Sequence, residues 1–419
     1  MFDTILFEVR ANDMNSDPEL KTEAAQIMVA ASCPACGGNE FERFFEISEL
    51  PVNCIALCPT QEAALGCPKA RIELGFCLRC GAVSNLAFDA ARLTYDPSYD
   101  NSLHFSSTFQ KYADEVARYL IERYDLHGKT IIDVGCGNGE FLTLVCGLGN
   151  NRGVGFDPSF IPGRTSLEAG KGITIIQDYY SEQYAEHGAD FLMCRHVLEH
   201  VARPQRFLRS LRATLTEKPG AAIFFELPSA SFIFQNKGIW DIIYEHCFYY
   251  SSGALARLFS SCGFDVLNVS DSFNGQYLCL EACVSSRETG FLGDAGGDLD
   301  SMRDDILGFA DEYRSCRTHW EDELGRLARQ GKRVALWGAG AKGAMFLNAF
   351  RNATSLEYIV DVNPHKCGLY IPGTGQEVVS PEFLKQYRPD VLLIVNPNYR
   401  DEISHQVSAL GIVPDLLSI

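Results

Sequence analysis

The chain has 419 residues, of which 46% are hydrophobic, and a formal net charge of −18. Its length predicts two to four domains, and the lack of any apolar run of about 18 residues predicts no membrane span. A surface this acidic repels phosphate backbones, so nucleic acid is not expected as a partner. The first residues hold acids and no basic stretch, which indicates no signal peptide and a cytoplasmic protein.

The N-terminal part is expected to divide into an extension over residues 1–31 and a zinc-binding module over residues 32–95. Four cysteines form two Cys-x-x-Cys-Gly pairs: Cys33, Cys36, Cys77 and Cys80. Each pair aims two thiolates at one point, and two pairs complete a tetrahedral site, which predicts structural Zn²⁺ without an open position for catalysis. Buried thiols or a redox pair are the alternative. Three cysteines between the pairs complicate the choice of ligands: Cys54, Cys58 and Cys67.

Residues 96–285 alternate helix-like and strand-like runs, which predicts a doubly wound α/β domain. A helical period runs from about Leu103 to Tyr124. The next run is β-branched and stops at glycines, as a buried parallel strand does before a helix. The expected strands are IIDV, GVGFD, ITIIQD, ADFLMC, AAIFFEL, DVLNVS and YLCLEAC.

The run IIDVGCGNGEF places Asp133 at a strand end and three glycines directly after it. Gly135 and Gly137 let the backbone pass close to a ligand, and the helix that follows points its N–H groups at that ligand. The third glycine comes too early for the dinucleotide fingerprint GxGxxG. The form D-x-G-x-G-x-G instead resembles the first motif of class I S-adenosylmethionine (SAM)-dependent methyltransferases, with a dehydrogenase as the alternative.

The following strands extend this resemblance. Asp157 ends the next strand about 20 residues on, where an acid can accept both ribose hydroxyls. The resemblance implies that Asp178 meets the adenine amino group, with Tyr179 beside the ring. Arg195, at the exit of the fourth strand, completes the expected cofactor site.

A Gly- and Asp-rich linker followed by one amphipathic helix that ends at Gly331 is expected over residues 286–330. Residues 331–419 predict a second Rossmann-like α/β domain, because GAGAKG matches GxGxxG and an acid follows on the next strand. Lys342 in the turn and Lys366 beyond it would hold phosphates as point charges. We therefore expect a nucleotide- or phosphate-bearing substrate here, with NAD binding by an oxidoreductase, or mere packing against a neighbour, as alternatives.

Taken in chain order, the CxxCG pairs, D-x-G-x-G-x-G, RHVLEH, FELP, YEHCFYY and GAGAKG resemble a three-domain, zinc-containing C-methyltransferase family. This family includes sugar-nucleotide 3-C-methyltransferases, and the resemblance covers about residues 32–415. It implies a zinc module, a class I methyltransferase domain and a C-terminal Rossmann-like domain. It also implies a small-molecule substrate, a nucleotide-activated keto sugar or related precursor, methylated on carbon through an enolate. N- or O-methylation of a secondary metabolite or polysaccharide precursor, or a non-catalytic zinc-bearing scaffold, are the alternatives.

The segment WDIIYEHCFYYSSG carries the catalytic residues that the resemblance implies. In the sugar enzymes a Tyr-His-Glu-His segment lies over the substrate, and its last His takes a proton beside a keto group. Aligning Glu-His places Glu245 and His246 on the last two positions, whereas a shift of one residue puts Cys247 on the final His. His246 is the expected base, Glu245 its orienting partner and Tyr244 a donor to the enolate. A polar corner under a loop is the alternative.

Three further residues are expected at the substrate. Tyr99 and His104 match a family segment that covers the substrate, and a helix N-cap region is the alternative. His200 shares a helix face with His196 in RHVLEHV and can approach the transferred methyl group, although packing or capping explains the pattern equally well.

Overall fold

The structure is a computed structural model that describes residues 32–164, 172–215, 218, 221–285, 298–351 and 356–419. The predicted extension over residues 1–31 and most of the predicted linker lie outside the described residues. Within these ranges no helix is both long and apolar enough to cross a membrane.

The central domain is a seven-stranded sheet in the order β10-β11-β8-β7-β4-β5-β6. Its strands are β4 (Thr130–Val134), β5 (Arg152–Phe156), β6 (Ile173–Ile176), β7 (Phe191–Arg195), β8 (Ala222–Pro228), β10 (Phe264–Ser272) and β11 (Tyr277–Val284). All seven expected strands are present, and β11 alone runs antiparallel to both of its neighbours. The predicted α/β domain is confirmed.

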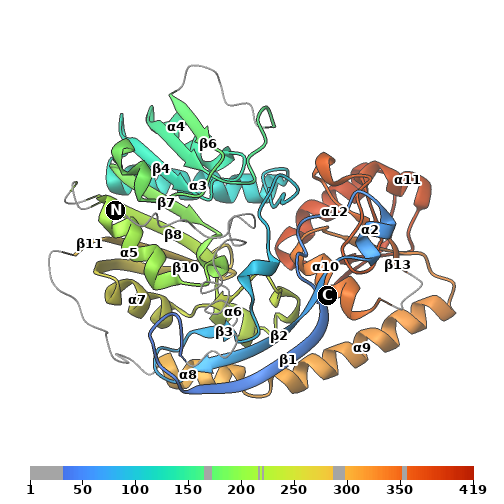
Figure 1. Cartoon of the computed structure of the whole chain (residues 1–419). Helices are drawn as coiled ribbons and strands as arrows, with labels where there is room; N and C mark the ends of the chain where they lie inside the picture. The colour runs from blue at the N-terminus through green and yellow to red at the C-terminus, as the bar shows by residue number, and fades with distance from the viewer. Residues whose placement is uncertain (1–31, 165–171, 216–217, 219–220, 286–297, 352–355) are drawn as a thin grey trace, which may run out of the picture.

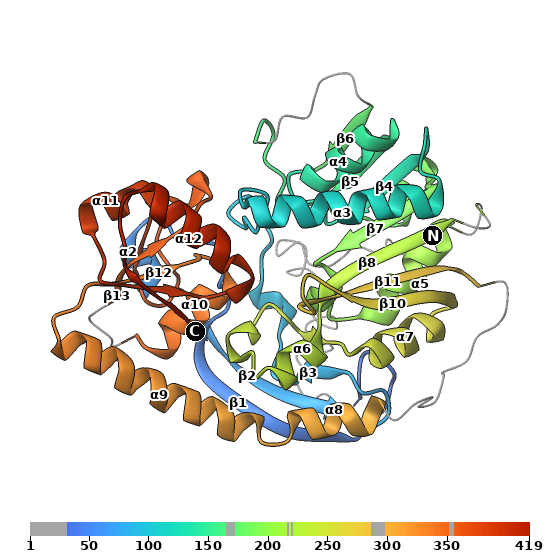
Figure 2. The ribbon, with the colours of Figure 1, turned by 180° about the vertical axis from the view of Figure 1, so that it is seen from behind.

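Helices cover both faces of this sheet (Figure 2). The core of one face includes α3 (Ser107–Tyr124) and α4 (Glu140–Gly149). The core of the other face includes α5 (Pro204–Leu215) and α7 (Ser252–Ser261). This double winding leaves the carboxyl ends of the parallel strands open for a ligand.

The N-terminal module contributes a long hairpin of β1 (Phe41–Pro51) and β2 (Lys69–Cys77). The sheet continues through β3 (Val83–Asn85) to β9 (Phe248–Tyr249), in the order β1-β2-β3-β9. The last strand therefore comes from the segment with the predicted catalytic residues. Figure 1 shows the hairpin curving away from the central domain toward the C-terminal domain. There α2 (Gln61–Leu65) lies in the hairpin loop, and Ala64 O accepts from Gly373 N at 2.8 Å.

The single amphipathic helix expected before Gly331 is wrong, because the structure has two. These are α8 (Asp298–Ile306) and α9 (Phe309–Arg329), which meet at Gly308. Gly308 takes a left-handed φ of 74°, which ends one helix before the next begins. The break lets α8 contact α6 (Ala230–Gln235) while α9 follows β1. The expected end is confirmed, because α9 stops two residues before Gly331, which has a φ of 65°.

The C-terminal domain is a five-stranded parallel sheet in the order β14-β13-β12-β15-β16. Its elements are β12 (Val334–Trp337), α10 (Ala341–Ala349), β13 (Leu356–Val360), β14 (Glu377–Val379), α11 (Leu384–Tyr387), β15 (Val391–Ile394), α12 (Arg400–Ala409) and β16 (Asp415–Ser418). The three expected strands are β12, β13 and β15. The short β14 and β16 extend the sheet at its edges.

Phe309 lies where the three parts of the chain share one apolar core. Its ring centre is 5.3 Å from that of Phe45 in β1 and 5.0 Å from that of Phe234 in α6, both edge-on. The side chain is fully buried. The first turn of α9 therefore joins the hairpin to the central domain.

We expect Phe309→Ala to lower the free energy of unfolding by about 3–5 kcal/mol, because it leaves a cavity in this shared core. Urea unfolding followed by circular dichroism measures the change. Leu307→Ala, at a side chain that is 56% exposed only two residues away, is the control. Equal midpoints for the two variants would contradict the assigned role of Phe309.

Candidate active site

A cavity of about 450 Å³ lies between the central and C-terminal domains. Its walls include the carboxyl ends of β4, β5, β7, β12 and β13 and the segment 99–106. The structure brings these predicted cofactor residues to it: Asp133, Gly135, Gly137, Asp157, Tyr179 and Arg195. It also brings these predicted substrate and catalytic residues to it: Tyr99, His104, His200, His246, Lys342 and Lys366. Sequence segments more than 200 residues apart thus meet at one site.

The first glycine-rich loop is held by the acid of the next strand. Gly135 and Gly137 have φ of 74° and 57°, and a Cβ on Gly135 would lie 2.1 Å from Val197 Cγ2. Gly137 N donates to Asp157 Oδ2 at 2.8 Å, and Ser159 N donates to Oδ1 at 2.8 Å. The loop and the predicted ribose acid therefore form one rigid unit at the cavity wall.

Three buried ionisable groups lie behind this loop, namely Asp133, Arg195 and Glu226. Burial raises the pKa of Asp133 to about 7, against the opposing effect of Arg195. Arg195 Nη2 lies 2.8 Å from Glu226 Oε1, and its guanidinium carbon lies 3.9 Å from the ring centre of Phe141. Although burial opposes it, the Arg195 charge brings the pKa of Glu226 down to about 2. Arg195 is therefore held in the cavity wall, and the carboxylate of Glu226 neutralises its charge.

Asp178 and Tyr179 differ in their relation to the cavity. Tyr179 lines it, whereas Asp178 is not among the lining residues. The Asp178 carboxylate accepts from the Tyr184 hydroxyl at 2.6 Å and from Tyr179 N at 2.8 Å. Contact of Asp178 with adenine stays a prediction.

His246 presents a neutral imidazole to the cavity. Burial, followed by the neighbouring His200, holds the pKa of His246 well below its ordinary value. The ring centres of His200 and His246 are 4.9 Å apart. His200 Nδ1 lies 2.9 Å from the backbone O of Glu245. Because a carbonyl oxygen only accepts, Nδ1 carries the proton and Nε2 keeps its lone pair.

The side chains of Glu245 and Tyr244 accept hydrogen bonds from the N-terminal module. The buried Glu245 carboxylate accepts from Cys54 N at 2.5 Å and from Ile55 N at 3.3 Å. The Tyr244 hydroxyl accepts from Asp89 N at 2.9 Å. Neither side chain is among those lining the cavity. Both tie the segment 240–253 to the N-terminal module, so their contacts do not supply the expected orienting and donor roles.

Two tyrosines near His200 offer hydroxyls instead. The ring centres of Tyr95 and Tyr99 lie 5.8 Å and 6.4 Å from that of His200. Both line the cavity, and among the described residues neither buried hydroxyl has a hydrogen-bond partner. Sequence analysis singled out Tyr99 and missed Tyr95, although the short run YDPSY holds both.

The second glycine-rich loop repeats the first on the opposite wall. Ala339 N donates to Asp361 Oδ2 at 2.8 Å, and Asn363 N donates to Oδ1 at 2.8 Å. Two lysine side chains lie beside this second loop. Lys366 Nζ donates to Ala339 O at 3.0 Å, and the Lys342 ammonium pairs with the Asp241 carboxylate.

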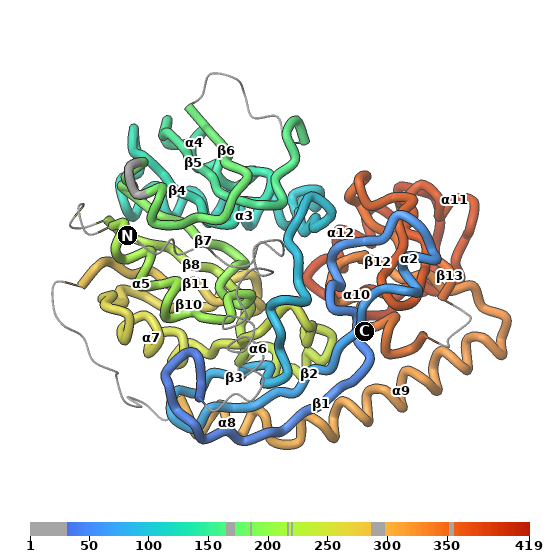
Figure 3. Tube along the Cα trace, in the orientation of Figure 1, coloured from blue at the N-terminus to red at the C-terminus, as the bar shows by residue number. Residues whose placement is uncertain are grey.

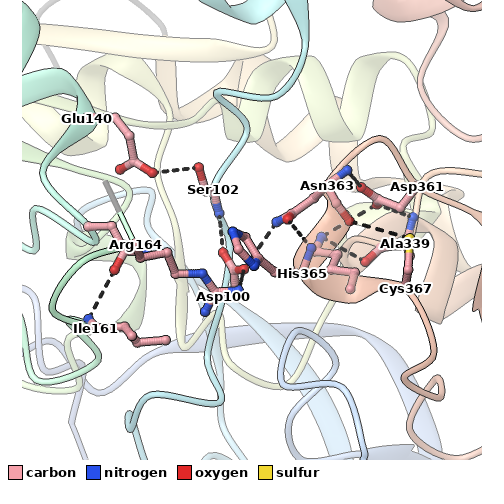
Figure 4. A network of polar contacts seen from close by, with 12 residues as sticks. Asp100, Ser102, Glu140, Ile161, Arg164, Ala339, Asp361, Asn363, His365 and Cys367 are labelled. Carbon is pink, nitrogen blue, oxygen red and sulfur yellow. Dashed lines mark hydrogen bonds and ion pairs between the residues drawn. The ribbon is translucent and has the colours of Figure 1, made fainter. Parts of the chain in front are cut away.

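The chain between β3 and α3 rises between the two domains (Figure 3). Asp100 Oδ2 accepts from Arg164 Nη2 at 2.8 Å and from Asn363 Nδ2 at 3.1 Å (Figure 4). Ser102 Oγ donates to Glu140 Oε1 at 2.9 Å, in the first turn of α4. This segment, which we call the strap (residues 99–106), is thus bonded to both domains.

The strap ends at a helix start that the C-terminal domain caps. Glu402 of α12 accepts from Ser106 Oγ at 2.6 Å, Ser107 N at 3.1 Å and Thr108 N at 2.9 Å. An acid at a helix N-terminus also interacts favourably with the helix dipole. In the strap itself, burial lowers the pKa of His104 to about 4, so this cavity residue is uncharged at neutral pH.

The four paired cysteines converge on one point. Cys33 Sγ lies 3.8 Å from Cys80 Sγ, and Cys36 Sγ lies 3.6 Å from Cys77 Sγ. Bonds of about 2.3 Å to a tetrahedral Zn²⁺ place sulfurs about 3.8 Å apart, so the donor set fits zinc. The cluster does not include the three cysteines between the pairs.

Two family matches accompany this geometry. Residues 104–269 match a family described as a methyltransferase domain, and residues 300–411 match a C-methyltransferase C-terminal domain. The protein is a SAM-dependent methyltransferase. The second match places GAGAKG within a methyltransferase module, and neither the oxidoreductase nor the scaffold hypothesis accounts for these two matches.

Curated relatives of this methyltransferase carry out different transfers. The chain is 25% identical to the C-methyltransferase NovU of Streptomyces niveus over 299 residues, covering 68% of this chain and 70% of NovU. It is 35% identical to a ubiquinone biosynthesis O-methyltransferase of Proteus mirabilis over 131 residues, covering 30% of this chain and 51% of that one. Among solved structures, magnesium protoporphyrin IX methyltransferase of Synechocystis, with bound SAH, aligns over 42% of this chain and 84% of its own, with 17% identity and a TM-score of 0.34.

We expect Asp157→Ala to weaken SAM binding about 10- to 100-fold, because the variant loses a charged acceptor and frees the Gly137 loop. Isothermal titration calorimetry with SAM measures the affinity. Asp265→Ala, at an exposed acid of β10, is the control. Unchanged affinity in Asp157→Ala would disprove the cofactor assignment.

Proposed function

We propose that this methyltransferase adds a methyl group to a carbon of a small acceptor after His246 removes a proton from that carbon. The observation that carries the proposal is the position of His246. Its neutral imidazole lines the cavity into which the first glycine-rich loop and the lysines of the second both open. A donor site, a base and an anion site thus share one cavity.

The residues of the first loop fit SAM. Gly137 has a φ of 57° and open space where a Cβ would lie, and the carboxylate of Asp157 lies at the strand end where ribose hydroxyls would bind. Asp133, Arg195 and Tyr179 complete the wall. When bound, SAM supplies an electrophilic methyl group. Aligning the two reactants can contribute roughly 7–11 kcal/mol of the barrier reduction.

His246 acts as the general base in this proposal. Because burial disfavours the imidazolium form, the ring is uncharged and can accept a proton throughout the neutral pH range. A positioned base contributes about 10²- to 10⁴-fold in rate. The unpartnered hydroxyls of Tyr95 and Tyr99 would donate to the oxygen that gains charge as the enolate forms.

The acceptor is expected to carry an anionic group, as a nucleotide-activated keto sugar does. With a net charge of −18, the protein repels anions at long range, so an anion site must be built locally. Lys342 and Lys366 lie beside a glycine-rich loop at the start of α10 and line the cavity. Such a loop and two ammonium groups suit phosphate oxygens.

The four-cysteine cluster is proposed to hold one structural Zn²⁺. The thiolates belong to a core shared with β8 and α7 of the central domain. Arg257 Nε of α7 donates to Cys80 O at 3.1 Å. A metal held there would join the hairpin to the central domain and, with four protein ligands, would take no part in catalysis.

We expect His246→Gln to slow methyl transfer about 10²- to 10⁴-fold without changing SAM affinity, because the base is lost and the cofactor loop is intact. The assay uses labelled SAM with a panel of nucleotide sugars and their phosphate-free counterparts. His405→Gln, at an exposed histidine of α12, is the control. Transfer at the native rate in His246→Gln would refute the base, and equal use of phosphate-free acceptors would refute the anion site.

We expect the purified protein to contain about one zinc ion per chain by plasma mass spectrometry, and Cys36→Ser to lose most of it. Loss of a ligand should also lower the thermal midpoint, because binding energy at such sites stabilises the fold. Cys58→Ser, outside the cluster, should retain its zinc. Equal metal content in the two variants would rule out the proposed site.

A further inference from the structure

Methylation at carbon leaves a proton on His246 in the proposed function, and His246 must lose it before the next turnover. We propose that Glu199 takes this proton from His246 and passes it toward His196. Glu199 is thus a relay residue that acts through the base. This inference rests on the proposed role of His246.

Glu199 lies beside the two histidines of the cavity. It belongs to the short helix η3 (Leu198–His200), directly after β7, and its side chain is 3% exposed. One carboxylate oxygen of Glu199 and one ring nitrogen each of His200 and His246 lie within 4.8 Å of one another. This is a separation that a single water molecule spans.

Two polar atoms of this cluster are unpaired. Among the described residues, no hydrogen-bond partner reaches Glu199 Oε2 or His246 Nδ1. A buried polar atom without a partner is unfavourable, and a proton transferred between these two groups would relieve this. Packing alone therefore does not account for these two unpartnered atoms.

The neighbouring His200 is a poorer proton acceptor than Glu199. Its Nδ1 already donates to the Glu245 carbonyl, and burial lowers the pKa of the ring to about 4. Burial instead raises the pKa of the Glu199 carboxyl to about 7. A proton thus moves favourably from the desolvated imidazolium of His246 to Glu199, while His200 holds the geometry.

The step balances in bonds and charge. The acceptor C–H bond breaks as an N–H bond forms on His246, and the freed electron pair forms the new C–C bond. The S–CH₃ bond breaks with its pair remaining on sulfur. The imidazolium N–H then breaks as an O–H bond forms on Glu199, which restores the neutral base.

The next titratable group beyond Glu199 is His196. Its Oε1 lies 3.8 Å from His196 Nδ1, and His196 Nε2 lies 2.8 Å from Glu226 Oε1. Glu226 Oε2 accepts from the Tyr112 hydroxyl at 2.5 Å. His196 has a left-handed φ of 54°, which is unfavourable for a residue with a side chain and indicates a functional constraint.

Titratable groups surround Glu199 from each adjoining element. They are His196 and His200 of its own segment, Cys194 of β7, Glu226 of β8, Tyr99 of the strap, and His246, Cys247 and Tyr250 of the segment 240–253. His246 is the group that lies beside the acceptor carbon in the proposed function, and its Nδ1 has no hydrogen-bond partner among the described residues.

Infrared difference spectroscopy of the full chain, titrated between about pH 5 and 8, tests the relay without any acceptor. We expect a protonated-carboxyl band that Glu199→Gln weakens, and the part that this variant removes should have a midpoint that His246→Gln shifts, because the two groups share a proton. Glu312→Gln, at an exposed acid of α9, should leave the band unchanged. A band that Glu199→Gln leaves intact, or that His246→Gln does not shift, would overturn the relay.

Turnover measurements distinguish a failure of the proposed relay from a failure of the proposed function. With the acceptor that the nucleotide-sugar panel identifies, Glu199→Gln should lower kcat at least tenfold while KM and SAM affinity stay within about twofold. Glu199→Asp should recover much of kcat, since it restores a carboxyl. Loss of transfer in His246→Gln with native kcat in Glu199→Gln would refute the relay alone, whereas native transfer in His246→Gln would refute the base.

Discussion

In each of the two α/β domains, a carboxylate from one strand ties down the glycine-rich loop of its neighbour. Asp157 accepts from Gly137 N, and Asp361 accepts from Ala339 N, each at 2.8 Å. Because parallel strands end together, each loop is fixed at the carboxyl edge of its sheet. The packing of the domains turns these two edges toward one cavity. These two bonds thus hold in place the two glycine-rich loops that frame the proposed donor and anion sites.

Burial also shifts the pKa values of several ionisable groups that line the cavity. Burial lowers the pKa of His200 and raises the pKa values of Asp133 and Glu199, so each of these three groups is shifted toward its neutral form. These neutral forms limit the charge that the three groups add beside a sulfonium donor. The permanent charges stand at the walls, where Arg195 pairs with Glu226 and Lys342 with Asp241. The neutral side chains therefore add little charge of their own next to the charges that the reactants bring.

Local patterns account for what the sequence predicted well. The seven central strands are apolar runs, and the glycine loops and cysteine pairs are contiguous motifs whose geometry depends on few residues. The direction of a side chain does not follow from local patterns in this way. Whether Tyr244, Glu245 or His246 faces the cavity depends on the pairing of β9 with β3 and on the loop at Cys54, which are contacts across 164 residues or more. The break at Gly308 likewise arises because α8 and α9 pack on different parts of the fold.

The contact between Glu402 and the start of α3 bears on how such enzymes can be recombined. One carboxylate of the C-terminal domain serves three donors of the central domain, so the cap of α3 and the proposed acceptor wall lie in the same domain. Exchanging C-terminal domains between relatives would therefore alter the stability of α3 along with that wall. A graft that lacks an acid at this position exposes three unmatched donors beside the strap. Chimeras that retain the acid keep the helix start intact while the acceptor wall changes.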